Sequence, residues 1–127
     1  MIRKFHEAKT LGLTEVEIWG TGTPMREFLH VDDLADALIF LSENYSSPEI
    51  INVGPGEDIS IRNLAWKIQN IIGYEGDIRF NPTYPDGTMR KVMDVSRIFS
   101  MGWSPKYTLE DGIKMTYDFY KSQNIRK

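Results

Sequence analysis

The chain contains no cysteine and only two histidines, His6 and His30. Disulfide bonds and thiolate metal sites are therefore excluded, and two imidazoles far apart in the sequence make a poor set of metal ligands. No apolar run approaches the roughly 20 residues that a membrane-spanning helix needs. The formal net charge is −3, so the overall charge does not favour nucleic acid, and any anion site has to come from a local group of basic residues. We expect a cytoplasmic protein.

The length and composition are those of one globular domain, with 127 residues of which 41% are hydrophobic and 26% charged. The segment 1–8 has the pattern of an amphipathic helix. It is not a signal peptide, because no apolar core follows its charges. We therefore expect residues 1–127 to form one domain of a larger protein.

Apolar periodicity and turn residues predict helices and short strands in mixed order. Gly12 and Gly73 are expected to end helices, while Asp32 or Asp33, Ser60 and Thr108 are expected to begin them. Several strands are joined by loops rather than by crossover helices, so the fold class is α/β, as a small mixed α+β unit rather than a complete doubly wound sheet. The expected strands are 16–19, 27–30, 50–53, 77–80 and one that contains Arg90 and Lys91, and the expected helices are 2–11, 33–47, 60–72, 96–101 and 108–120.

One loop attracts attention because it combines two glycines, a proline and an arginine, in the sequence Trp19-Gly-Thr-Gly-Thr-Pro-Met-Arg26. The guanidinium of Arg26 offers a planar pair of donors to a phosphate, and N–H groups of the loop can add to it. The alternative is a surface ion pair with Glu27 or Asp33, which contributes little. Trp19 either offers an aromatic face to a sugar or base, or packs in the core.

Two further places carry polar candidates. Arg90 and Lys91 are neighbours on an expected strand, so they point to opposite faces and only one can serve a given site. Their alternative role is that of charges on a solvated edge strand. Asp86 precedes Gly87, and this pair is a turn signal first and a ligand contact second.

The residues that would signal catalysis are missing or have simpler explanations. No G-x-G-x-x-G follows a strand, so there is no dinucleotide fingerprint. Tyr117 and Lys121 have the spacing Tyr-x-x-x-Lys, but Tyr117 fits the apolar face of the last helix, so we reject them as a catalytic pair. Asp32 and Asp33 are interpreted as helix caps and His30 as a hydrogen-bonded structural histidine. We expect no catalytic residue in this chain.

The segment 19–37 closely resembles the substrate-domain signature of the extended short-chain dehydrogenase/reductases that act on nucleotide sugars. Other segments resemble one group within that family, the epimerase-reductases of GDP-4-keto-6-deoxy-mannose. The resemblance covers essentially the whole chain, in family order. The segments that carry the narrower resemblance are Arg3–Ala8, Thr23–Phe28, Ile51–Gly54, Pro85–Asp94 and Gly102-Trp103.

The resemblance implies a substrate site and no metal. The residue at the position of Arg26 binds the diphosphate of the GDP-sugar, and the residue at Trp19 lines the same pocket. Lys4 occupies a basic position that contacts substrate, where some members have arginine. Asp86 and Lys91 are implied at the nucleotide end.

The resemblance also implies what lies elsewhere. In the family, two carbons of a 4-keto sugar are epimerised, and NADPH then reduces the ketone. The NADP-binding glycines and the catalytic residues are implied upstream of Met1. The chain would then be the C-terminal GDP-sugar-binding part, inactive alone, of a homodimeric enzyme whose N-terminal Rossmann domain is its partner. Two rival functions stay open: the substrate domain of another nucleotide-sugar epimerase or dehydratase, and a stand-alone binding module without catalysis.

Overall fold

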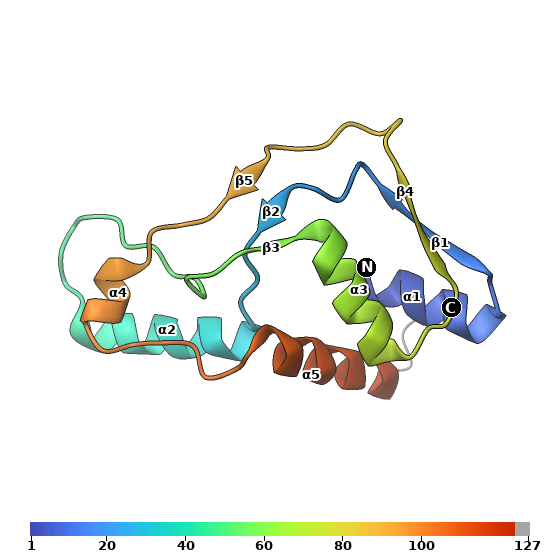
Figure 1. Ribbon diagram of the computed structural model, residues 1–127. Coiled ribbons are helices and arrows are strands. Elements are labelled where there is room, and N and C mark those ends of the chain that lie inside the picture. Colours follow the sequence, from blue (N-terminus) through green and yellow to red (C-terminus); the bar gives the residue numbers. More distant parts are fainter. Residues whose placement is uncertain (124–127) are drawn as a thin grey trace.

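The computed structural model describes residues 1–123, in which helices and short strands follow one another in mixed order (Figure 1). The α/β class expected from the sequence is confirmed. No helix within residues 1–123 combines the length and the apolar character needed to cross a membrane. In chain order the elements are α1 (Ile2–Leu11), β1 (Glu15–Trp19), β2 (Met25–Arg26), α2 (Val31–Asn44), β3 (Ile59–Ser60), α3 (Ile61–Ile72), β4 (Asp77–Asn81), β5 (Arg90–Lys91), α4 (Ser96–Ser100) and α5 (Leu109–Ser122).

The strands form two small sheets. β1 pairs in parallel with β4, and the register sets Trp19 opposite Asn81 at the end of both strands. In the second sheet β2 is the central strand, antiparallel to β3 and parallel to β5. Arg26 thereby lies opposite Lys91. Both sheets contribute to the surroundings of the loop that follows β1.

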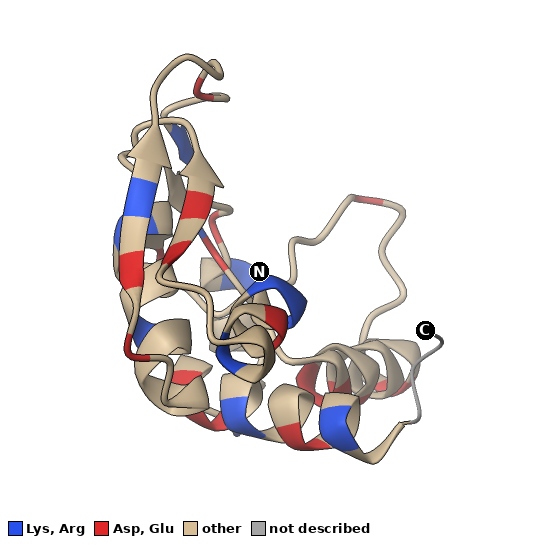
Figure 2. Ribbon diagram, turned by 90° about the vertical axis from the view of Figure 1, so that its right-hand side faces the viewer, with Lys and Arg blue, Asp and Glu red and all other residues tan. Residues whose placement is uncertain are grey.

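Charged residues of both signs lie along the β1–β4 pair (Figure 2). Arg79 of β4 binds Glu15 at 3.0 Å and Glu17 at 2.7 Å, both on β1. On the other face of β1, Val16 and Ile18 are buried. This alternation follows from the two-residue period of a strand, and it fixes which side of the pair faces the core.

The larger core lies where α1, α3 and α5 meet β1 and β4. Gly12 and Gly73 end α1 and α3 in the left-handed conformation, with φ of 65° and 69°, as the sequence predicts. Ser60 and Thr108 cap α3 and α5, and Thr108 forms a full capping box with Asp111. The buried residues of this core are Phe5, Ala8, Val16, Ile18, Leu64, Ala65, Ile68, Ile72, Tyr74, Ile113 and Tyr117.

A smaller core joins α2 to α4 at the other end of the molecule (Figure 1). Its buried members are Ala37, Val95, Ile98 and Trp103. The indole N–H of Trp103 donates to Asp36 of α2 at 3.0 Å, so the polar atom of this buried ring is satisfied.

Two of the expected strands are wrong. The strand predicted at 27–30 is instead Met25–Arg26, because β3 and β5 meet the chain at those residues. The segment 50–53 forms no strand, and Ile50 at its start is 91% exposed. Within residues 1–123 no strand pairs with this segment. An apolar, β-branched sequence cannot make a strand without a neighbouring backbone to hydrogen-bond.

The predicted cap of α2 is also wrong. The helix begins at Val31 with His30 as its N-cap, and the His30 Nδ1 accepts a hydrogen bond from the Asp32 N–H at 3.3 Å. Asp33 is only 1% exposed, and its carboxylate accepts from the backbone N–H groups of Lys106 at 2.9 Å and Tyr107 at 3.1 Å. Asp33 therefore ties α2 to the segment before α5, and a histidine ring serves where an acid was expected.

The apolar face predicted for α2 is only partly buried. Ala37 is fully buried, but Leu34 is 41% and Leu38 is 58% exposed. Ile39, beside them on the same helix, is 62% exposed. The apolar residues of α2 thus exceed what the described part of the chain covers.

We predict that Asp33→Ala lowers the free energy of unfolding by roughly 3 kcal/mol, because two buried N–H groups lose a charged acceptor. Asp33→Asn should lose less, since its amide oxygen still accepts one of the two bonds. Urea unfolding of the variants measures this. Asp32→Ala is the matched control, because the Asp32 side chain is 62% exposed, and it should cost under about 1 kcal/mol. Equal losses for Asp33→Ala and Asp32→Ala would contradict the tie.

Candidate functional site

The loop between β1 and β2 depends on two glycines. Gly20 and Gly22 have φ of 83° and 77°, in the left-handed region that favours glycine. A Cβ on Gly20 would collide with the Asp86 carboxylate, and one on Gly22 would lie 2.5 Å from the Phe80 ring. The loop can therefore lie directly against β4 and the segment that follows it.

The segment after β4 folds back over the same loop. The Tyr84 N–H donates to the Asn81 carbonyl at 3.3 Å, and the Asn81 side chain accepts from the N–H and hydroxyl of Thr83. Further along, the Asp86 carboxylate accepts from the Thr21 N–H at 2.9 Å and from the Thr21 hydroxyl at 2.6 Å. The segments 20–24 and 82–88 are thus joined, although more than sixty residues separate Thr21 from Asp86 in sequence.

A cavity of about 130 Å³ lies where these segments meet β2. It brings together three of the five candidate residues, namely Trp19, Arg26 and Asp86. Its remaining lining is Gly22, Pro24, Ile61, Pro85 and Gly87. Half of the eight lining residues are glycines or prolines, so much of the surface around the one arginine is backbone or a compact side chain.

Arg26 does not make the surface ion pair that was its alternative role. The Glu27 carboxylate accepts from the Met93 N–H at 3.0 Å, and the carboxylate of Asp33 is bound to the segment before α5. The Arg26 Nη1 donates to the Met25 carbonyl at 2.6 Å, and its Nη2 lies 3.2 Å from the point where a Cβ on Gly87 would stand. Arg26 makes no ion pair with residues 1–123.

Trp19 is not a core residue, since it is 63% exposed. Its ring stacks on that of Tyr84, with centroids 4.4 Å apart and planes inclined by 15°. Lys4 lies beside the same ring. Its ammonium donates to the Glu17 carbonyl at 2.8 Å and stands 5.9 Å from the Trp19 ring centroid. The structure therefore places Lys4 next to the cavity, although not in its lining.

Lys91 lies outside the cavity lining, on β5 next to Arg26. Its neighbour Arg90 binds Asp58, with Nε to Oδ2 at 2.6 Å. Of these two basic residues, Arg90 has a protein partner, and Lys91 makes no ion pair within the described residues. Of these two residues, Lys91 is therefore the one whose charge is available to a ligand.

The residues rejected as catalysts have structural roles. The Tyr117 ring is buried, with its hydroxyl 3.0 Å from the His6 Nδ1. The Lys121 ammonium binds Asp118 at 2.8 Å and lies over the Tyr117 ring. His30 is the hydrogen-bonded structural residue that the sequence predicts. No cluster of three or more metal-ligating side chains occurs in residues 1–123.

Sequence reasoning missed the residues that bind the two segments together. Neither Thr21 nor Tyr84 was a candidate, yet they hold Asp86 and Trp19 in place. The signal that could have found them is the pair Asn81-Pro82, which favours a turn. Such a turn brings the following residues back towards Trp19, which pairs with Asn81.

The Thr21 hydroxyl, together with the Thr21 backbone N–H, holds the pKa of the Asp86 carboxyl below its ordinary value. A carboxyl whose pKa is lowered by folding stabilises the folded state. This stabilisation is complete at pH values above the unfolded pKa of about 3.9, and it disappears as the pH falls through the folded pKa. We predict that the NMR shift of the Thr21 amide titrates with a midpoint below about 3.9. In Asp86→Asn this titration should vanish. A Thr21 amide that is insensitive to acid in the unmodified chain would show that the contact is not formed.

Comparisons with known proteins show what the chain as a whole is similar to. Residues 1–54 match the NAD dependent epimerase/dehydratase family. GDP-L-fucose synthase 1 of Arabidopsis thaliana is 52% identical over 120 residues, which are 94% of this chain and 37% of the plant protein. The chain therefore spans well under half of the length of such relatives.

Two solved structures show the same fold over nearly the whole chain. A GDP-6-OMe-4-keto-L-xylo-heptose reductase from C. jejuni is 39% identical with a TM-score of 0.87, covering 97% of this chain and 47% of the reductase. A GDP-L-fucose synthetase from Naegleria fowleri, bound to NADP, is 28% identical with a TM-score of 0.87, covering 94% of this chain and 38% of that protein. The chain is accordingly similar to the GDP-L-fucose synthases over nearly its whole length, and its residues 1–54 match the NAD dependent epimerase/dehydratase family, in line with the resemblance of its sequence motifs.

Proposed function

We propose that this chain binds the GDP moiety of a GDP-sugar, as the C-terminal domain (residues 1–127) of an NADP-dependent epimerase-reductase of the GDP-L-fucose synthase type. The observation that carries the proposal is the Arg26 guanidinium in a small cavity walled by glycine and proline. The similarity to proteins named for GDP-sugars supports it.

Arg26 is proposed to bind the diphosphate. A guanidinium can donate two parallel hydrogen bonds to phosphate oxygens, and both bonds are stronger where water is excluded. Asp86 lies in the same lining and would repel an anion. Its two hydrogen bonds from Thr21 offset part of that negative charge. In this proposal Asp86 shapes the nucleotide end of the site by holding its loop.

Trp19, Lys4 and Lys91 complete the proposed site. Trp19 presents an exposed aromatic ring beside the cavity, suited to a nucleoside. Lys4 and Lys91 lie on different elements, α1 and β5, and each brings a positive charge towards the anion. On a chain of net charge −3, these three basic residues would supply the local positive charge that attracts a diphosphate.

The contribution of this chain to the reaction is binding energy at a part of the substrate that does not react. Holding the GDP moiety positions the sugar for groups elsewhere in the enzyme. NADPH would supply the hydride, but the residues of this chain do not fit it: the sequence has no dinucleotide fingerprint, and Tyr117 and Lys121 are engaged in the α5 packing. No catalytic step is therefore assigned to this chain.

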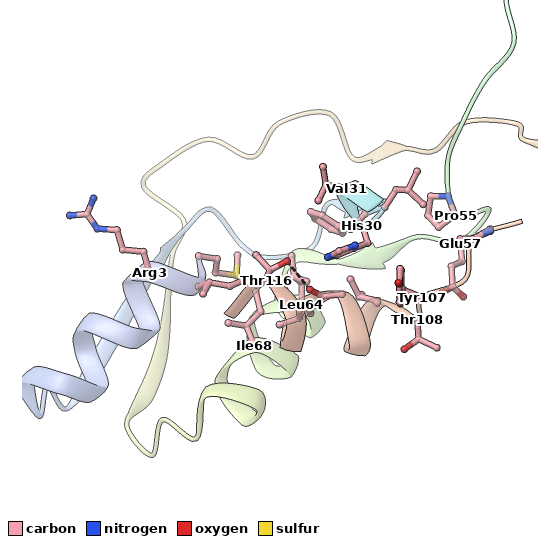
Figure 3. Close-up of a pocket in the computed structure, with 18 residues that line it drawn as sticks. Arg3, His30, Val31, Pro55, Glu57, Leu64, Ile68, Tyr107, Thr108 and Thr116 are labelled. Atoms are coloured by element: carbon pink, nitrogen blue, oxygen red, sulfur yellow. Dashed lines mark hydrogen bonds between the residues drawn. The ribbon is translucent and has the colours of Figure 1, made fainter. Parts of the chain in front are cut away.

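The proposed partner is the N-terminal Rossmann domain that the family resemblance implies. An apolar hollow of about 570 Å³ opens among α1, α3, α5 and the start of α2, with Leu64 and Ile68 on one side and His30 and Val31 on the other (Figure 3). Together with the exposed apolar side chains of α2 and the exposed Ile50, it forms apolar surface of the kind that another domain covers. Homodimerisation of the whole enzyme stays a prediction.

A second candidate is the same role in an enzyme for a different GDP-sugar. The C. jejuni reductase at 39% identity is named for a GDP-heptose. Since the cavity described here faces the nucleotide end, its residues do not distinguish between these sugars. Assay of the enzyme that carries this chain with GDP-4-keto-6-deoxy-mannose and with a GDP-4-keto-heptose would separate the two.

We predict that Arg26→Ala weakens GDP binding by one to two decades in Kd, because the loss of a charged hydrogen-bonding partner costs roughly 1.5–3 kcal/mol. Arg26→Lys should recover only part of the affinity, since lysine keeps the charge but loses the planar pair of donors. Titration of the 127-residue chain with GDP, followed by calorimetry or NMR shifts, measures both.

The control for this prediction is Arg97→Ala. Arg97 lies on α4 and binds Glu49 at 2.8 Å and the Tyr45 hydroxyl at 3.0 Å, away from the cavity. Its loss should leave GDP affinity unchanged. If Arg26→Ala lowers the melting temperature without lowering GDP affinity, the loop is a structural turn and the diphosphate site is wrong.

We further predict that GDP binds more tightly than UDP, because the relatives named above act on GDP-sugars. Calorimetric titration with both nucleotides under the same conditions tests this. Equal affinities would favour a UDP-sugar enzyme or a general diphosphate binder, while binding of neither would remove the proposed function.

A further inference from the structure

Two exposed aromatic rings stand at the mouth of the Arg26 cavity. Trp19 is 63% and Tyr84 is 40% exposed, yet the two rings are nearly parallel, with centroids 4.4 Å apart. The two rings are thus stacked, which is one of the arrangements in which aromatic pairs attract each other. Neither ring belongs to either hydrophobic core. The stack therefore orders two side chains at the surface without serving the packing of the fold.

The local sequence places Tyr84 at this point. Asn81 ends β4 opposite Trp19, and Pro82 occupies the second position of the turn that the Tyr84 N–H closes on the Asn81 carbonyl. This turn reverses the direction of the chain. Tyr84 therefore lies over Trp19, the residue that pairs with Asn81 in the β1–β4 register. Pro85 follows at once and restricts the backbone further.

The contacts between the two segments form an ordered series. Trp19 meets Tyr84, Thr21 meets Asp86 two residues further along each segment, and Arg26 meets Gly87. The series runs from the two exposed rings to the half-buried Arg26, and Trp19 and Arg26 line the same cavity. A ligand whose anionic part contacts Arg26 can therefore place its remaining part beside the stacked rings.

The size of the cavity decides which part of a ligand can enter it and which part stays beside the rings. At about 130 Å³ it is well below the roughly 300 Å³ at which pockets for drug-sized ligands begin. A diphosphate can enter, but a nucleoside attached to it has to lie outside, at the rim. Trp19 is the aromatic residue of the cavity lining, and Tyr84 stands against its ring.

We propose that Tyr84 is a positioning residue for the nucleoside: by stacking on Trp19 it fixes the indole at the rim, so that the exposed part of the indole meets the base or ribose of a nucleoside diphosphate. The inference rests on the proposed function. Ordering a side chain before the ligand arrives removes an entropy cost from binding. Tyr84 therefore acts through Trp19, and a phenyl ring can replace it because its hydroxyl is not part of the stack.

The test compares Tyr84→Ala and Tyr84→Phe with the unmodified 127-residue chain, using GDP and inorganic pyrophosphate as ligands. Tyr84→Ala should weaken GDP binding about three- to tenfold, the range expected for losing one aromatic pair and one ordered ring. Pyrophosphate, which reaches only Arg26, should bind equally well to all three. Tyr84→Phe should bind GDP within about twofold of the unmodified chain. Tyr45→Ala is the control, because Tyr45 ends α2 and bonds to Glu49 and Arg97, away from the cavity.

The possible results separate this inference from the proposed function. If GDP and pyrophosphate bind the unmodified chain but Tyr84→Ala binds GDP equally well, the positioning role is wrong and the diphosphate site stands. Tighter binding of either ligand to Tyr84→Ala would show that Tyr84 obstructs the site, which also overturns the inference. If neither ligand binds the unmodified chain, both proposals fail. The indole N–H signal of Trp19 in the NMR spectrum should shift in Tyr84→Ala and stay in place in Tyr84→Phe, which checks the stack without any ligand.

Discussion

The parallel pairing of β1 with β4 is the constraint on which the candidate site depends. Because parallel strands end at the same edge of a sheet, the segments that follow Trp19 and Asn81 leave the sheet side by side. Everything in the site follows from that proximity: the stacked rings, the hydrogen bonds between Thr21 and Asp86, and the cavity between them. β2 then carries Arg26 into the space that these segments enclose. The site is thus a property of strand register as much as of the residues that line it.

Local signals in the sequence predicted the parts of the fold that are themselves local. The glycines that end α1 and α3 and the threonine that caps α5 act within one helical turn, so their patterns are legible without tertiary structure. The cap of α2 was not, because His30 is an uncommon N-cap and Asp33 is drawn away by two N–H groups more than seventy residues distant. The segment 50–53 has the composition of a strand, but pairing requires a partner that residues 1–123 do not supply.

The candidate site divides in the same way. Arg26 and Trp19 stand out in a loop of glycines and proline, and a resemblance between sequences extends to Lys4, Lys91 and Asp86. Their arrangement cannot be predicted from the local sequence, because it depends on the pairing of β4 with β1. Tyr84 shows the limit clearly: in sequence it is one aromatic residue between two prolines, and only the register opposite Trp19 gives it a neighbour.

The pairing of β1 with β4 also bears on how the protein folds. Four elements, β2, α2, β3 and α3, lie between these strands in the chain, so pairing the strands requires the closure of a long loop. Helices such as α3 and α5 gain their hydrogen bonds locally and can form early, whereas long-range parallel pairing is intrinsically slow. The segments 20–24 and 82–88 can meet only after the strands that precede them have paired. The cavity around Arg26 therefore belongs to the late-forming part of the molecule, and the rate at which it forms again on refolding is set by strand closure rather than by helix formation.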